Sequence, residues 1–208
     1  MPNEIKKIHK KIKKAICERK KEFLENQKKP TKIFKELVFC LLTPQSKAEK
    51  AWESVNNLFL DKKIFEKDAG KLAEKLKVRF KFNKAKYLKE AYRKYLGKER
   101  KLLVLIKEKK SIIETRDYLV KEIKGFGYKE ASHFLRNIGF GKEIAILDRH
   151  ILRNLVRFGV IKEIPKTLNR KKYLEIEEKM RKFALNKGVP LFDLDFIFWY
   201  KETGKVFK

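Results

Sequence analysis

Apolar residues recur at three- and four-residue steps along most of this chain, and this spacing constrains its fold more than any other feature. The first segment shows it plainly, with isoleucines at Ile5, Ile8, Ile12 and Ile16. Such spacing places the apolar side chains on one face of an α-helix, which here runs towards Asn26. No stretch alternates apolar and polar residues between Asn-Gly or Asp-Gly turns, the pattern of a β-hairpin. The sequence therefore predicts an all-α fold.

The same spacing predicts further helices after Asn26. They cover residues 33–41, 47–59, 69–76, 84–96, 111–120, 148–159, 171–186 and 191–200. Thr43 and Pro44 follow the second helix. Because threonine is favoured as an N-cap and proline at the first helical position, we expect these two residues to begin the next helix.

The chain is strongly basic. Its 208 residues include 55 Lys and Arg against 27 Asp and Glu, a formal net charge of +28. With 43% hydrophobic residues, including 16 Phe, it can still build a packed core, which excludes a disordered basic tail. We expect a folded protein that binds a polyanion, although abundant lysine also serves solubility.

Cys17 and Cys40 are too few for a disulfide scaffold, a four-cysteine zinc site or a cysteine-ligated 4Fe–4S cluster. Residues 1–14 are densely charged and give no secretory signal. The longest apolar run, residues 37–42, is far shorter than the ~20 residues of a membrane span. We expect a cytoplasmic protein without contact with a membrane.

Gly125, Phe126 and Gly127 mark a tight turn between a helix that ends at Gly125 and one that begins near Tyr128. Glycines allow positive φ and a close approach of backbone amides to a phosphate, which the second helix's N-terminus also attracts. The same pair occurs at many ordinary helix ends. Lys129 follows in the first turn, where the helix dipole and neighbouring cations disfavour an ammonium. A lysine so placed can act as an amine nucleophile, whereas most lysines in such a chain are solvated cations.

Asp148 follows the apolar residues 144–147 and begins the triplet Asp148-Arg149-His150, nineteen residues after Lys129. Taken alone, it is an N-cap for the next helix. Combined with Gly-x-Gly-x-Lys at this distance, it forms a far more specific pattern.

This pattern resembles the helix-hairpin-helix DNA glycosylase superfamily, which includes endonuclease III and the 8-oxoguanine DNA glycosylases. Its members carry a hairpin like residues 125–131, then an Asp-x-His like residues 148–150. Residues 41–45, Leu-Leu-Thr-Pro-Gln, resemble the Leu-Leu-(Ser/Thr)-x-Gln element of endonuclease III relatives, and residues 83–88 resemble their Lys-Ala helix start. The resemblance covers about residues 30–200.

Two differences from other members of the superfamily indicate which of its families this sequence resembles most. The four-cysteine cluster of endonuclease III is absent, and the chain is too short for the extra N-terminal domain of human-type 8-oxoguanine enzymes. The sequence is therefore most similar to the compact, archaeal-type (type 2) 8-oxoguanine glycosylases, and its end at Phe207-Lys208 agrees with that group.

The resemblance also implies two helical lobes that flank a DNA-binding cleft. One lobe would comprise residues 31–146, with the helix-hairpin-helix at about 118–138. The other would comprise residues 1–30 plus 147–208 and carry the catalytic Asp.

The implied activity is that of a bifunctional repair enzyme, an 8-oxoguanine glycosylase and abasic-site lyase. Lys129 would attack C1′ of the damaged nucleotide, displace the base and form a Schiff base, and β-elimination of the 3′ phosphate would then nick the strand. Asp148 would orient the lysine and stabilise the positive charge that develops on the sugar.

The DNA-contacting residues follow from the same resemblance. The hairpin glycines Gly125 and Gly127 would bind the DNA backbone. Gln45 matches the glutamine that fills the gap left by the extruded base. Phe80 and Phe82 are candidates for a wedge on the other side, and we expect at least one of them to be a core aromatic instead.

For the base pocket, helical spacing provides the candidates. His133 lies four residues after Lys129, on the same helical face, although a buried histidine in the core is the plain alternative. Asp195 and Trp199, also four apart, match a polar reader and a stacking aromatic, with core packing as the rival role. Lys208 is expected to reach the pocket as well.

No cofactor and no iron–sulfur cluster are expected. In the superfamily the hairpin often binds a monovalent cation through backbone carbonyls, here those of Ile123 and Phe126. The expected partner is double-stranded DNA with an oxidised base or abasic site, bound by a monomer.

Three alternatives stay open from the sequence. The first is an endonuclease III-like glycosylase for oxidised pyrimidines without its cluster. The second is a non-catalytic helix-hairpin-helix module in which Lys129 only contacts phosphate. The third is a basic RNA-binding protein.

Overall fold

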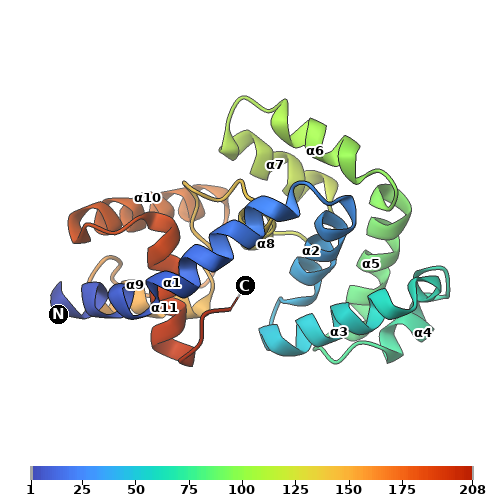
Figure 1. Cartoon of the computed structure of the whole chain (residues 1–208), viewed down its shortest axis with the longest axis horizontal. Coiled ribbons are helices and arrows are strands. Elements are labelled where there is room, and N and C mark those ends of the chain that lie inside the picture. Colours follow the sequence, from blue (N-terminus) through green and yellow to red (C-terminus); the bar gives the residue numbers. More distant parts are fainter. Residues whose placement is uncertain (1, 208) are drawn as a thin grey trace. The chain divides into compact units, whose positions relative to one another are not determined.

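The computed structural model describes residues 2–207, apart from the side chains of residues 2, 3 and 62. Over that range the chain forms eleven α-helices, one 3₁₀ helix and no strand, which confirms the all-α prediction (Figure 1). The helices are α1 (Pro2–Asn26), α2 (Pro30–Leu42), α3 (Ala48–Leu60), η1 (Lys62–Phe65), α4 (Ala69–Glu74), α5 (Lys81–Tyr95), α6 (Glu99–Lys107), α7 (Ile112–Glu122), α8 (Tyr128–Asn137), α9 (Arg149–Arg157), α10 (Arg170–Lys187) and α11 (Leu191–Thr203). None of these helices is long and apolar enough to cross a membrane.

The helices divide into two compact units. The central unit is Glu25–Phe134, and the terminal unit joins the chain up to Leu24 to the chain from Leu135 onward. The borders fall inside α1 and α8. The two lobes predicted from the sequence, with borders after residues 30 and 146, stay a prediction.

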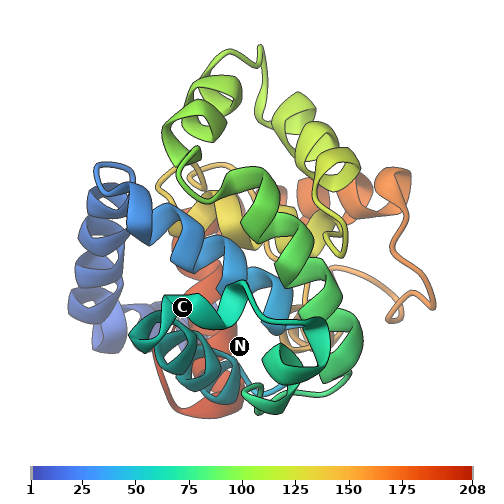
Figure 2. The ribbon, with the colours of Figure 1, turned by 90° about the vertical axis from the view of Figure 1, so that its right-hand side faces the viewer.

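In the central unit, α2 runs through the middle and packs against α3, α5 and α6 (Figure 2). Its apolar residues are therefore buried on nearly all sides. Phe34 is the aromatic centre of this core. Its ring lies 6.0 Å from the ring of Phe59, 5.9 Å from Phe65 and 6.4 Å from Tyr92.

In the terminal unit, α9 and α10 both pack against α11. The first two turns of α11 are buried, and their residues are apolar except for Asp193 and Asp195. Phe198 of α11 stacks on Phe158 at 5.5 Å, and Phe196 stacks on Phe23 of α1 at 6.4 Å. These ring contacts join α11 to α1 and to Phe158, the residue that follows α9.

Two local predictions were wrong. Thr43 does not begin a helix: it is the C-cap of α2, because its hydroxyl donates back to the Cys40 carbonyl at 3.1 Å, and the next helix begins only at Ala48. Helix α6 was missed because charged residues surround it on both sides. It is held by Leu102 and Ile106, two buried residues one turn apart.

Replacing Phe34 by alanine should lower the free energy of unfolding by about 3–5 kcal/mol, since a fully buried ring between three aromatic partners is lost. Phe82→Ala is the matched control, because that ring is 60% exposed and its loss should cost less than about 0.5 kcal/mol. Urea denaturation measures both. Equal losses in the two variants would contradict this account of the core.

Candidate functional site

The turn between α7 and α8 forms the hairpin of the predicted helix-hairpin-helix. The backbone N–H of Phe126 donates to the Ile123 carbonyl at 3.0 Å, which closes the turn. Gly125 has φ +93°, and a Cβ at this position would lie 2.5 Å from the ring of Tyr87. Only glycine therefore fits, for reasons of both backbone conformation and space.

Helix α8 begins with half of a capping box. The backbone N–H of Gly127 donates to Oε2 of Glu130 at 3.2 Å, as expected for a glutamate at the third helical position. The Tyr128 hydroxyl donates to Asp117 of α7, and Phe126 packs against Phe134 at 6.0 Å. The first turn of α8 is thus fixed on several sides.

The Lys129 side chain is 21% exposed and lies between its own helix and the end of α2. Its Nζ is 3.3 Å from Oγ1 of Thr43 and 3.6 Å from Oε1 of Glu130. The sequence predicted neither Thr43 nor Glu130 as a site residue, and it gave Thr43 only the role of a helix cap. The Leu-Leu-Thr-Pro-Gln segment, which resembles a family element, could have indicated Thr43.

A second lysine, Lys84 of α5, lies beneath the same turn and is only 4% exposed. Its Nζ donates to the carbonyls of Leu42 at 2.8 Å and Pro44 at 2.7 Å, and to Oγ of Ser46 at 3.0 Å. Burial lowers the pKa of Lys84 to about 8, and the charge of Lys129 acts in the same direction. Sequence reasoning did not identify Lys84 as a site residue, although it belongs to the Lys-Ala segment.

The three predicted DNA-intruding side chains are all exposed. Gln45 has φ +53° and Phe80 φ +56°, and no other non-glycine residue between 2 and 207 has a positive φ. Phe80 is 54% exposed and Phe82 60% exposed. The expectation that one of these phenylalanines belongs to the core is therefore wrong.

His133 is buried in the central unit. Its ring lies edge-on against Phe39 at 5.4 Å. This is the packing that the core alternative describes, and a role in the base pocket stays a prediction.

In the terminal unit, Asp148 is the N-cap of α9, as predicted. Its Oδ1 accepts from the backbone N–H of Ile151 at 2.8 Å, and the residue is half-buried. Two residues further along the chain, His150 of α9 lies edge-on to Trp199 of α11, with 4.8 Å between the ring centres. The Trp199 ring is half-buried and held in place by this contact.

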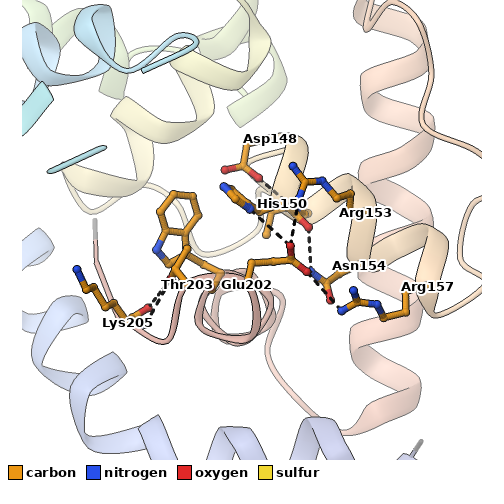
Figure 3. Close-up of polar contacts among 10 residues, drawn as sticks. Asp148, His150, Arg153, Asn154, Arg157, Glu202, Thr203 and Lys205 are labelled. Atoms are coloured by element: carbon orange, nitrogen blue, oxygen red, sulfur yellow. Dashed lines mark hydrogen bonds and ion pairs between the residues drawn. The ribbon is translucent and has the colours of Figure 1, made fainter. Parts of the chain in front are cut away.

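Glu202 joins α11 to α9 (Figure 3). Its carboxylate accepts from Nδ2 of Asn154 at 3.0 Å and pairs with Arg153 and Arg157, each at 3.4 Å. Nδ1 of His150 lies 3.8 Å from the same carboxylate. Sequence reasoning missed Glu202, although the basic and polar residues it meets share one face of α9.

Asp195 is buried and forms an ion pair with Arg136 at the end of α8. Its other carboxylate oxygen accepts from the backbone N–H of Ile146 at 3.4 Å. Both oxygens are therefore engaged inside the terminal unit. Lys208, the last of the predicted pocket residues, lies outside the described residues.

Lys129 belongs to the central unit and Asp148 to the terminal unit. The structure defines the surroundings of each within its own unit. Among residues 2–207 no group of three or more His, Cys, Asp or Glu side chains could hold a metal ion.

Comparison with known proteins gives a consistent result. A family model described as 8-oxoguanine DNA glycosylase matches residues 16–189. The chain is 50% identical to the 8-oxoguanine DNA glycosylase/AP lyase of Fusobacterium nucleatum subsp. nucleatum, over 99% of this chain and 97% of that protein.

Solved structures agree. The 8-oxoguanine glycosylase/lyase of Methanocaldococcus jannaschii, crystallised in complex with 15mer DNA containing 8-oxoguanine, matches with a TM-score of 0.88 at 38% identity, covering 100% of this chain and 99% of that chain. The 8-oxoguanine DNA glycosylase of Thermotoga maritima matches with a TM-score of 0.87 at 36% identity, covering 100% and 98%.

Replacing Asp195 by alanine should lower the free energy of unfolding by about 3–5 kcal/mol, because Arg136 would keep a buried charge without its carboxylate. Asp148→Ala, which removes only a helix cap, should cost about 1 kcal/mol. Thermal and urea unfolding of the two variants measure the difference. A smaller loss for Asp195→Ala than for Asp148→Ala would show that the ion pair does not stabilise this unit.

Proposed function

The chain belongs to the 8-oxoguanine DNA glycosylase family, and from this membership we propose that it excises 8-oxoguanine from double-stranded DNA and cleaves the strand at the abasic site. The observation that carries the proposal is the similarity over nearly the whole length of both chains, at 50% identity, to a protein of that name. The alignment covers 97% of that relative, so the proposal relies on almost no part of it that this chain lacks.

Lys129 is the proposed nucleophile. Its amine forms a bond to C1′ while the bond from C1′ to the base breaks, and the base leaves. Opening of the sugar ring gives a Schiff base, from which loss of a C2′ proton expels the 3′ phosphate. The contact between its Nζ and the Thr43 hydroxyl supports this role, because it orients the amine while the side chain stays 21% exposed.

Asp148 is the proposed acidic partner. Its carboxylate accepts a backbone N–H at the start of α9, which holds the carboxylate at the end of that helix. An ionised carboxylate would stabilise the positive charge that develops on the sugar as the base departs.

The remaining contacts are proposed from the same family pattern. Gly125 and Gly127 would bind the DNA backbone, and Gln45 with Phe80 or Phe82 would enter the duplex. The exposure of Gly125, Gln45 and the two phenylalanines supports this assignment, and Gly127 is half-buried.

Within the base pocket, Trp199 and His133 are the proposed lining residues. His133 lies one helical turn after Lys129 on α8, and Trp199 of α11 is half-buried beside His150. We further propose a monovalent cation at the carbonyls of Ile123 and Phe126, and a monomer that acts on chromosomal DNA in the cytoplasm.

Lys129→Gln should abolish the covalent adduct that borohydride traps on duplex DNA containing 8-oxoguanine, and should slow base excision by more than about 1,000-fold, because no other amine replaces the nucleophile. Gel analysis of trapped complexes measures this. Lys124→Gln is the control, since it removes one hairpin charge from a side chain that is 64% exposed.

The same assay separates the alternatives. A preference of the wild-type protein for thymine glycol would indicate an oxidised-pyrimidine glycosylase. If no lesion gave a trapped adduct, the non-catalytic module would remain. In a separate binding measurement, an affinity for undamaged RNA equal to that for lesion-containing DNA would favour the RNA-binding protein.

Thr43→Val should slow adduct formation about tenfold at saturating DNA, because the amine loses the hydroxyl that orients it. Thr115→Val is the matched control: it removes a buried hydroxyl in α7 that accepts nothing from Lys129 and only donates to the Ser111 carbonyl. Single-turnover trapping measures both variants. Equal rates for wild type and Thr43→Val would exclude this contact from catalysis.

A further inference from the structure

Two exposed residues of the central unit have a backbone conformation that L-amino acids avoid. Gln45 has φ +53° and Phe80 φ +56°, and neither is a glycine. Left-handed conformations of this kind persist only where the surrounding contacts enforce them. The residues that enforce these conformations therefore contribute to the function of Gln45 and Phe80.

Lys84 supplies the contacts at Gln45. Its ammonium donates hydrogen bonds on both sides of Gln45, to the carbonyls of Leu42 and Pro44 and to the Ser46 hydroxyl. An ammonium has three N–H donors, and these three oxygens match them one to one. Gln45 is thereby enclosed between two residues that bind the same nitrogen.

Ser46 connects these hydrogen bonds of Lys84 to the loop that carries Phe80. Its hydroxyl accepts from Lys84 at 3.0 Å and from the backbone N–H of Arg79 at 3.1 Å, and it donates to the Pro44 carbonyl at 3.3 Å. The single donor and both acceptor positions of this hydroxyl are thus used. Arg79 directly precedes Phe80, and its guanidinium lies 5.4 Å from the centre of that ring.

A second tie holds the same loop. The backbone N–H of Lys77 donates at 2.9 Å to Oγ of Ser54, a fully buried residue of α3. The loop that ends in Phe80 is therefore attached to serines at two points. The Ser46 attachment is the one that depends on Lys84.

We propose that Lys84 is a positioning residue, which holds Gln45 and Phe80 together as one preformed edge that enters the DNA duplex. This inference rests on the proposed function, since it concerns how the lesion is extruded. Extrusion of a base requires side chains ready to occupy its place. An edge fixed before DNA binds loses less conformational entropy on insertion than two mobile loops would.

The position of Lys129 depends less on the hydrogen bonds of Lys84 than the positions of Gln45 and Phe80 do. Its partner Thr43 is fixed by its own hydrogen bond to the Cys40 carbonyl, within the last turn of α2. Loss of Lys84 should therefore impair base extrusion and leave the chemistry of the amine largely intact.

The test compares two substrates. Lys84→Met should slow single-turnover excision of 8-oxoguanine from paired duplex by about 10–100-fold. Borohydride trapping on a single-stranded abasic site, which needs no extrusion, should change by less than about threefold. Ser46→Ala, which keeps the lysine and removes the shared hydroxyl, should show the same split, and provides the test if Lys84→Met does not fold.

The matched control is Lys86→Met, an exposed lysine two residues along α5, which should behave as wild type on both substrates. A double-mutant cycle with Gln45→Ala adds a second readout. If Lys84 acts through Gln45, the two effects on duplex excision should be far from additive.

Unchanged duplex excision in both Lys84→Met and Ser46→Ala would overturn the proposal. Equal loss on the duplex and on the single-stranded abasic site would also overturn it, because Lys84 would then act on the amine itself. Failure of the wild-type protein to trap any substrate would instead refute the proposed function.

Discussion

The buried ammonium of Lys84 is the interaction on which the arrangement of the central unit's site depends. A charge that is 4% exposed is costly to bury unless its hydrogen bonds are replaced. Here the carbonyls of Leu42 and Pro44 replace them, and the Leu42 carbonyl lies at the end of α2, where carbonyls have no partner within the helix. The negative end of the helix dipole favours the same cation. One side chain thus binds both the end of α2 and the turn that follows it.

Two lysines then share one region with a single carboxylate. Glu130 lies 3.6 Å from Lys129, and its charge also acts on Lys84. Burial lowers the pKa of Lys84 to about 8, and repulsion from the charge of Lys129 acts in the same direction. The charge of Lys84 therefore has one neighbour that opposes it, Lys129, and one that favours it, Glu130.

Local patterns predicted the features that neighbouring residues create. Asp148 caps α9 through an amide three residues away, and Gly125 turns between consecutive helices, so both could be read from short stretches. Lys84 could not, because its partners lie 38 to 42 residues away in the sequence. Asp195 shows the same limit. Four-residue spacing places it on one face with Trp199, but only the fold reveals that Arg136 occupies its carboxylate.

The two units preorganise their functional side chains by different means. In the terminal unit, the Glu202 carboxylate joins α11 to α9, and this fixes Trp199 against His150 through ordinary helix packing. In the central unit, Gln45 and Phe80 lie on loops, each in a conformation that costs about 1–3 kcal/mol. A glycine at either position would remove that cost but also the side chain. The two strained residues thus present the side chains that the proposed insertion into the duplex requires.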